Sequence, residues 1–246
     1  MPDKEWMSKY EKIKEQLNCS VDLETYFTEK QIAERDVDVM EIGKINFPTG
    51  LVVACDPLCM LGVCSPYMQT IPVGTYSVKI CVVPSEKYGD RYSCVKLEVS
   101  GNKPVRYEIA LTGKEDLDTE LEEDQFFGFG VDAGMGCIVD LQTQDEFDKY
   151  TEMRSRKNKD YDPYYDFFCD ALEKSYAENP KYQQEGGDWA IWTVPETNCN
   201  IPIFHSGWGD GAYPCYFGYD ENNAVCGVYI LFIDIEREYE DLEIDY

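Results

Sequence analysis

Two blocks of strand-like sequence, separated by one helical segment, most constrain what this chain can fold into. Between residues 43 and 111, β-branched and aromatic residues form short runs interrupted by Pro and Gly, which is typical of consecutive strands. Residues 144–178 show helical spacing instead, with Asp162 as a candidate N-cap and Pro163 at the first helical position. Strand-like runs return over residues 189–235. The pattern predicts an α+β fold with a mainly antiparallel β-sheet or sandwich core, an N-terminal helical segment and a helical insertion.

The first 42 residues differ from this core in their pattern. Apolar residues recur every three to four positions across residues 6–17, and Asp3 is a candidate N-cap, so a helix is expected there. A second helix is expected over residues 20–35. The chain is interpreted as one α+β domain of residues 1–246, made of a helical N-terminal extension (1–42), a β-rich core (43–235) and an acidic tail (236–246) that is expected to fray.

Two short polar segments predict hairpin turns. Residues 101–103 are expected to join a strand over residues 91–99 to a strand over residues 105–111. Residues 220–223 are expected to join the last two strands of the chain in the same way. Each prediction places two strands that are neighbours in sequence side by side in a sheet.

The chain is strongly acidic. Its 246 residues include 48 acidic and 22 basic ones, which gives a formal net charge of −26. This charge disfavours binding to nucleic acids or to anionic membrane surfaces, and it favours the approach of a basic protein partner. With 43% hydrophobic residues the chain is too apolar to be disordered. No apolar run approaches the roughly 20 residues of a membrane-spanning helix.

The cysteines and the N-terminus indicate a cytoplasmic protein. The 11 cysteines are odd in number, and most lie in apolar strand-like runs, as expected for small hydrophobic residues in a reducing compartment. The first residues are charged and lack the apolar core of a secretory signal. The cluster Cys55-x₃-Cys59-x₄-Cys64 matches no zinc or iron–sulfur spacing, so three unrelated thiols are expected there.

Two glycine-rich segments are the most distinctive motifs. They span residues 128–137 and 206–214 and place aspartates near glycines that permit tight turns. One hypothesis is that Asp132, Asp140 and Asp210 form a catalytic site, and that Asp132 and Asp210 also bind a metal ion, because carboxylates suit hard cations. The alternative is that these carboxylates accept hydrogen bonds from turn amides and only shape the loops.

His205 is the single histidine and therefore the one candidate for an imidazole acid or base. Cys137 and Cys215 lie in glycine-rich neighbourhoods and are candidate nucleophiles beside it. A hydrogen-bonded structural histidine next to a turn is the alternative interpretation. The chain has no phosphate-binding P-loop, no Gly-x-Gly-x-x-Gly that opens a helix after a strand and no His-Glu-x-x-His motif, so no cofactor is predicted.

Four segments carry a resemblance to a known family. They are residues 48–57, 71–78, 131–140 and 206–220, with patterns that include Pro-Thr-Gly, Val-Asp-Ala-Gly and Ser-Gly-Trp-Gly-Asp-Gly. In these segments the chain resembles bacterial proteins catalogued as domain of unknown function 4241, and the resemblance extends over about residues 43–235. It implies a bacterial, cytosolic, single-domain protein. It implies no reaction, cofactor or catalytic residue, so Asp132, Asp140 and Asp210 are motif positions only.

The charge and the lack of an assembled catalytic motif favour a non-catalytic binding protein. One concrete form is an immunity- or antitoxin-like protein that masks a basic partner protein. The first alternative is a hydrolase, metal-assisted or not, that uses Asp132, Asp140 and Asp210 with His205 as an acid–base group. The second is a small-ligand-binding or structural module, which would show an apolar pocket lined by tyrosines.

Overall fold

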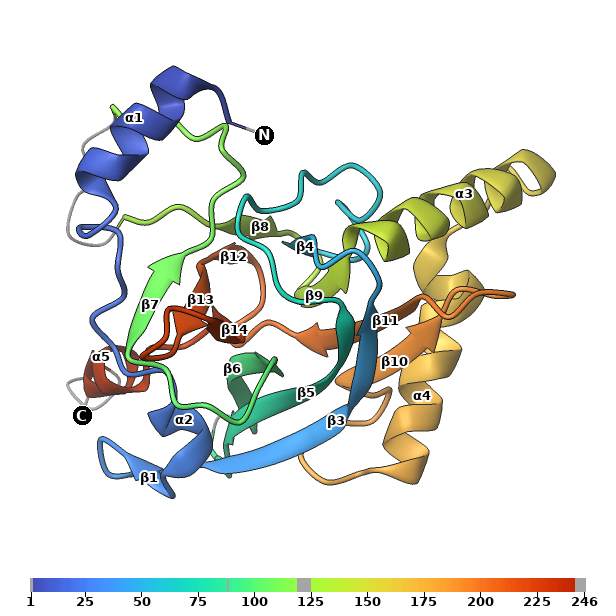
Figure 1. Ribbon diagram of the computed structural model, residues 1–246. Helices are drawn as coiled ribbons and strands as arrows, with labels where there is room; N and C mark the ends of the chain where they lie inside the picture. The colour runs from blue at the N-terminus through green and yellow to red at the C-terminus, as the bar shows by residue number, and fades with distance from the viewer. Residues whose placement is uncertain (1, 88, 119–124, 242–246) are drawn as a thin grey trace.

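The two strand-like blocks of the sequence are interleaved in space. In the computed structural model, which describes residues 2–87, 89–118 and 125–241, strands from both blocks share each of the two main sheets (Figure 1). The larger sheet has the order β3-β5-β6-β14-β13-β7, formed by Asp38–Phe47, Gly74–Val83, Arg91–Glu98, Val225–Leu231, Cys215–Tyr219 and Arg106–Ile109. The smaller sheet has the order β10-β11-β9-β4, formed by Trp189–Thr193, Asn200–His205, Met135–Asp140 and Val52–Cys55.

Two short strand pairs accompany these sheets. β8 (Phe129–Val131) pairs with β12 (Gly211–Tyr213), and β1 (Gln31–Ile32) pairs with β2 (Arg35–Asp36). Within the described part of the chain, every pairing between named strands is antiparallel. The expected α+β fold with mainly antiparallel sheets is therefore confirmed.

The four-stranded sheet lies between the six-stranded sheet and a helical layer. Alternate residues of a strand point to opposite faces of a sheet. Accordingly, Ala54 and Ile138 belong to the core shared with the larger sheet, whereas Val53 and Cys137 belong to the core shared with the helices. The helical layer consists of α3 (Leu141–Lys157), the π-helical turn η1 (Tyr164–Phe168) and α4 (Cys169–Glu178). α3 projects beyond the sheets on one side of the molecule (Figure 1).

The predicted helical insertion is present, with an earlier start. It begins at Leu141, three residues before the expected position, because the carboxylate of Asp140 caps the helix by accepting a hydrogen bond from the Gln142 amide. The prediction for Asp162 is confirmed, since its Oδ1 accepts hydrogen bonds from the amides of Tyr164 and Tyr165 at 2.8 and 3.3 Å.

The N-terminal segment departs from the expectation in its second half. α1 (Lys4–Ile13) is the first predicted helix and has Asp3 as its N-cap, but it ends at Ile13, four residues before the expected end at Leu17. The second predicted helix is wrong: only α2 (Thr25–Thr28) is helical, and the β1–β2 hairpin follows it. Ala33 and Glu34 at the hairpin turn have φ values of 45° and 63°, a left-handed conformation that a right-handed helix does not contain.

β3 also begins earlier than expected, at Asp38 rather than at residue 43. The carboxylate of Asp38 accepts hydrogen bonds from Lys181 Nζ at 2.7 Å and from the Tyr182 hydroxyl at 2.9 Å. These hydrogen bonds, that of Lys181 first, lower the pKa of Asp38 to about 2. The contact therefore joins the start of the larger sheet to the segment that follows α4.

The Asp38 contact predicts a defined pH dependence of stability. Because the folded pKa lies below the unfolded value of 3.8, the stabilisation is present above pH 4 and is lost as the pH falls toward 2. Asp38→Asn is expected to lower the free energy of unfolding by about 1 kcal/mol at pH 7, a figure discounted for the partly exposed site. Urea titrations from pH 7 to pH 3 should show the difference from wild type shrinking. A constant difference would contradict the linkage.

One hairpin prediction is confirmed and the other is wrong. Residues 220–223 join β13 to β14, and Asp220 Oδ1 accepts hydrogen bonds from the amides of Asn222 and Ala224. Residues 101–103 do not join paired strands. β6 pairs with β5 and β14, whereas β7 pairs with β13. The C-terminal hairpin thus lies between β6 and β7, because its two strands bury apolar side chains such as Val228 against the middle of the sheet.

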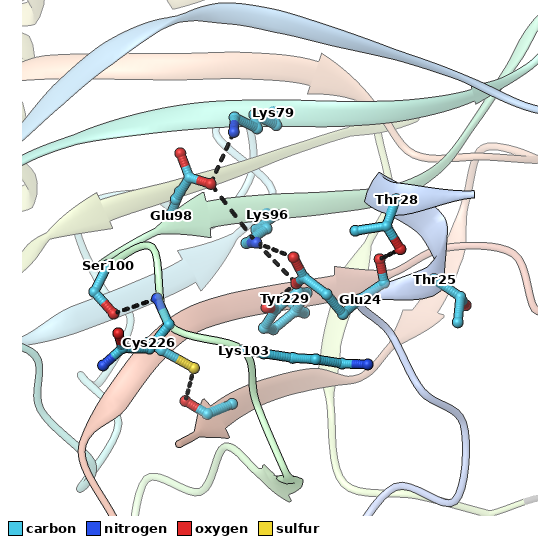
Figure 2. A network of polar contacts seen from close by, with 12 residues as sticks. Glu24, Thr25, Thr28, Lys79, Lys96, Glu98, Ser100, Lys103, Cys226 and Tyr229 are labelled. Atoms are coloured by element: carbon cyan, nitrogen blue, oxygen red, sulfur yellow. Dashed lines mark hydrogen bonds and ion pairs between the residues drawn. The ribbon is translucent and has the colours of Figure 1, made fainter. Parts of the chain in front are cut away.

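The outer face of the larger sheet holds a buried ion pair under α2 (Figure 2). Lys96 of β6 is 4% exposed, and its Nζ lies 2.8 Å from both carboxylate oxygens of Glu24. The Tyr229 hydroxyl donates to Glu24 Oε2 at 2.7 Å. Burial, together with the Glu24 charge, raises the pKa of Tyr229, so its hydroxyl stays protonated as a donor. The network joins the N-terminal extension to the centre of the sheet.

The C-terminal tail was expected to fray from residue 236. Instead, Ile235–Asp241 forms the helix α5 (Figure 1), and the Asp234 amide donates a hydrogen bond to Glu238 Oε1 at 3.0 Å. Residues 242–246 of the expected tail lie outside the described residues. Among the helices that the structure describes, none is long and apolar enough to cross a membrane.

Candidate functional site

The two glycine-rich segments meet at one end of the four-stranded sheet. β8 and β12 pair them directly, with Gly130 opposite Ala212. Next to this pair, the Gly134 amide donates to Asp210 Oδ1 at 2.9 Å and the Ser206 amide donates to the Gly134 carbonyl at 3.1 Å. We call residues 131–135 and 205–211 the motif loops. Two segments about 75 residues apart therefore form one interlocked unit.

Asp56 organises the motif loops, although sequence reasoning did not single it out. It is fully buried at the end of β4, and its Oδ2 accepts hydrogen bonds from the amides of Asp132 and Ala133 at 2.9 and 2.8 Å. Its Oδ1 accepts from the amides of Leu58 and Cys59. The sequence feature that could have indicated Asp56 is its position in segment 48–57, which resembles the known family and includes a buried strand. Asp56 thus fixes the backbone that carries Asp132.

Asp132 and Asp210, two of the predicted site residues, lie at exposed positions of the motif loops. Asp210 uses one oxygen to hold Gly134, and the carboxylate of Asp132 forms no hydrogen bond or ion pair within the described residues. Both lie near Cys59: burial and the charges of Asp56, Asp132 and Asp210 raise the pKa of that thiol. The structure therefore places both carboxylates at exposed positions of two loops that are hydrogen-bonded to each other.

Asp140 lies elsewhere. It ends β9, five residues after Met135, which places it about 17 Å along the strand from the motif loops. Its fully buried carboxylate accepts hydrogen bonds from the amides of Thr49, Gly50 and Gln142 and from the Thr49 hydroxyl, all at 2.8 to 2.9 Å. The structure therefore does not assemble Asp140 with Asp132 and Asp210, and the proposed three-aspartate catalytic set is corrected on this point.

His205 is held by Asp188, a residue that the sequence did not indicate. Its Nδ1 lies 3.0 Å from Asp188 Oδ1, and the His205 amide donates to the Asp188 carbonyl at 2.9 Å. The imidazole is 43% exposed. Cys137 and Cys215, the suggested nucleophiles, are both buried, and burial raises the pKa of Cys215 to about 12. Among the described residues neither thiol is hydrogen-bonded to His205, so no nucleophile–base pair is formed.

A groove of about 690 Å³ opens beside the second motif loop. Its lining includes Trp208, Asp210, Tyr213, Tyr216, Asp234 and Glu238. Trp208 is 42% exposed, and its indole Nε1 donates to Glu238 Oε2 at 2.8 Å. Burial raises the pKa of Glu238. The charged residues that line the groove are three acidic ones, Asp210, Asp234 and Glu238, and one basic one, Arg237.

No metal centre emerges from the residues that the structure describes. Within that part of the chain, no three His, Cys, Asp or Glu side chains are arranged to hold an ion, and this includes Asp132 and Asp210. The three cysteines of the sequence cluster differ in their surroundings: Cys59 is exposed, Cys64 is partly buried, and the buried Cys55 has its Sγ 3.6 Å from that of Cys137.

A family profile matches the part of the chain that contains both motif loops. The profile of the family described as protein of unknown function DUF4241 matches residues 45–230, and the chain belongs to this family. The resemblance seen in the sequence is thereby confirmed. No curated protein and no solved structure matches the chain. Asp56 and both motif loops lie inside the matched range, whereas Glu24 and the helix α5 lie outside it.

Proposed function

We propose that this protein is a non-catalytic binding protein that receives a basic segment of a partner protein at the motif loops and the adjoining groove. The observation that carries the proposal is that two exposed carboxylates, Asp132 and Asp210, lie on loops that hydrogen bonds to Asp56 and Asp210 hold in place. A rigid, unpaired carboxylate at the surface is a ready acceptor for a cation. An immunity- or antitoxin-like protein that masks a basic target is one form of this function.

Long-range electrostatics supports the same class of partner. The net charge of −26 attracts a basic protein and accelerates its approach, and salt screens this attraction. The groove adds a local excess of acidic over basic side chains. We therefore expect the complex to form fastest at low ionic strength.

Local chemistry favours arginine as the side chain that is received. Guanidinium groups form paired hydrogen bonds with carboxylates and also stack on aromatic rings. Trp208 supplies an exposed ring beside Asp210. The guanidinium of Arg91 already lies 5.2 Å from the centre of this ring, so an incoming guanidinium has to displace Arg91 or stack on the opposite face of the indole.

A binding measurement with a defined probe tests the proposal. We expect fluorescently labelled nona-arginine to bind the wild-type protein at 50 mM salt and to be released at 500 mM. Asp132→Asn with Asp210→Asn should weaken binding about tenfold, which is about 1.4 kcal/mol. The asparagine at position 210 retains an oxygen for the Gly134 amide, so the loop keeps its shape.

The matched control changes the same number of charges elsewhere. Asp170→Asn with Glu178→Gln alters two exposed carboxylates of α4. Equal losses in both double variants would mean that net charge alone binds the peptide, and would remove the motif loops from the proposal. Both double variants can also be used as bait in cell lysate. A specific basic partner should be captured by the α4 variant and lost from the motif-loop variant.

A further inference from the structure

The loop that follows β4 exposes apolar side chains. Its sequence over residues 57–64 is Pro-Leu-Cys-Met-Leu-Gly-Val-Cys, which contains no charged residue. Val63 is 74% exposed and Met60 is 43% exposed. We call residues 57–64 the apolar loop. Large apolar side chains that gather in water on a folded chain mark an interaction surface.

Asp56 joins the apolar loop to the first motif loop. Its Oδ1 accepts hydrogen bonds from the amides of Leu58 and Cys59 at 2.8 and 3.2 Å. Its Oδ2 accepts hydrogen bonds from the amides of Asp132 and Ala133 at 2.9 and 2.8 Å. One fully buried carboxylate therefore holds both backbones, so the apolar loop and the first motif loop adjoin each other.

Hydrogen bonds at both ends keep the apolar loop in place. The Met60 amide donates to the Asp56 carbonyl at 3.0 Å, and the Val63 amide donates to the Met60 carbonyl at 3.2 Å. At the far end, the side chain of Gln144 on α3 donates to the Cys64 carbonyl at 2.8 Å. Because the loop is already ordered, a partner that binds it loses little of its binding free energy to ordering the loop.

We propose that the apolar loop and the motif loops form one docking surface for a basic segment of a partner protein in which aliphatic side chains alternate with arginines. The inference rests on the proposed function and adds the apolar half of the partner. Asp132 and Asp210 are the acceptors for guanidinium groups. Met60 and Val63 provide the apolar contact on the adjoining loop, and its burial excludes water from the charged contacts.

Charge favours this partner over a second copy of the chain. A symmetric contact between two copies would bring the carboxylates of both sets of motif loops toward each other, and each copy has a formal net charge of −26. Like charges across an interface disfavour association, whereas a basic segment neutralises them. The docking surface therefore fits a cationic, partly aliphatic partner.

Two ten-residue peptides of equal charge test the inference. One is Arg-Arg-Leu-Leu-Arg-Arg-Leu-Leu-Arg-Arg, and in the other serine replaces each leucine. Side chains of an extended peptide alternate between two faces, so arginine and leucine alternate along each face of the first peptide. In fluorescence anisotropy titrations, we expect the leucine peptide to bind the wild-type protein about tenfold more tightly than the serine peptide.

A matched pair of double variants locates the apolar contact. Met60→Gln with Val63→Ser should reduce the preference for the leucine peptide to less than about threefold and leave the affinity of the serine peptide unchanged. The control is Met153→Gln with Val73→Ser, because Met153 on α3 is 43% exposed and Val73 before β5 is 68% exposed. This control should keep the full preference. Circular dichroism of both variants verifies that the fold is retained.

The outcomes separate this inference from the proposed function. If the serine peptide binds through Asp132 and Asp210 but the leucine peptide binds no tighter, or if its preference survives in Met60→Gln with Val63→Ser, the inference is overturned and the proposed function stands. If neither peptide binds at 50 mM salt, both fail. Light scattering that finds a wild-type dimer and a monomeric Met60→Gln with Val63→Ser variant would assign the apolar loop to a second copy and would also overturn the inference.

Discussion

Replacing Glu24 with glutamine is expected to lower the free energy of unfolding by about 3–5 kcal/mol, because it leaves the Lys96 ammonium buried without its counter-ion. Lys96 Nζ lies 2.8 Å from both Glu24 oxygens (Figure 2). The next carboxylate, Glu98, is 3.8 Å away and is already paired with Lys79 at 2.8 Å. It therefore cannot replace the lost partner at full strength.

Urea denaturation at pH 7 measures this effect. Arg156 and Glu152 form an exposed pair on α3, so Glu152→Gln serves as the control and should change stability by less than about 0.5 kcal/mol. Adding Lys96→Met to Glu24→Gln should restore a large part of the loss, because the uncompensated charge is then removed. A loss below about 1 kcal/mol in the single variant would show that water reaches Lys96 in solution.

The location of this ion pair gives the N-terminal extension a structural role. Glu24 lies before the range that matches the family profile, whereas Lys96 and Tyr229 lie within it. α1 makes a similar connection, since the Tyr10 hydroxyl donates to Glu108 of β7. The extension therefore covers the outer face of the larger sheet instead of standing apart from it. Loss of stability in Glu24→Gln would report this attachment.

Asp140→Ala is expected to lower the free energy of unfolding by about 3 kcal/mol or more. The carboxylate accepts hydrogen bonds from three amides, those of Thr49, Gly50 and Gln142, in a fully buried position. Each buried donor left without an acceptor costs about 1–3 kcal/mol, and the helix α3 loses its N-cap as well. Asp132→Ala, at an exposed position, should change stability by less than about 0.5 kcal/mol.

The comparison of these two variants separates a structural aspartate from a functional one. Thermal and urea denaturation should show that Asp140→Ala is far less stable than Asp132→Ala. In nona-arginine binding we expect the reverse: Asp132→Ala should weaken binding of the peptide more than Asp140→Ala does. An Asp140→Ala variant as stable as wild type would contradict the structural role and return Asp140 to the hydrolase hypothesis.

Local features of the chain were predictable because they depend on neighbours in sequence. The caps at Asp3 and Asp162 and the turn at Asp220 each form hydrogen bonds to amides within four residues. Such contacts are visible as short patterns. The helix predicted over residues 20–35 failed although its competitor is also local: Ala33 and Glu34 adopt a left-handed conformation, and residues 31–36 form the two-stranded β1–β2 hairpin instead.

The site was less predictable than the fold. The glycine-rich motifs correctly indicated where Asp132 and Asp210 would lie, because loops with such glycines are read from sequence alone. Asp56, Asp188 and the contact between Cys55 and Cys137 were missed. These residues act on partners far along the chain, and the two thiols are 82 residues apart. A long-range contact leaves no periodic or spacing signal in one sequence.

The α+β class, the glycine-rich motifs, the family resemblance and the acidic charge can all be recognised in the unfolded chain. These properties follow from composition and from patterns that repeat over a few residues. The strand order, with β13 and β14 between β6 and β7, and the separation of Asp140 from the motif loops are visible only in the folded protein. The physical reason is that burial of apolar faces selects among strand pairings that local preferences leave equivalent.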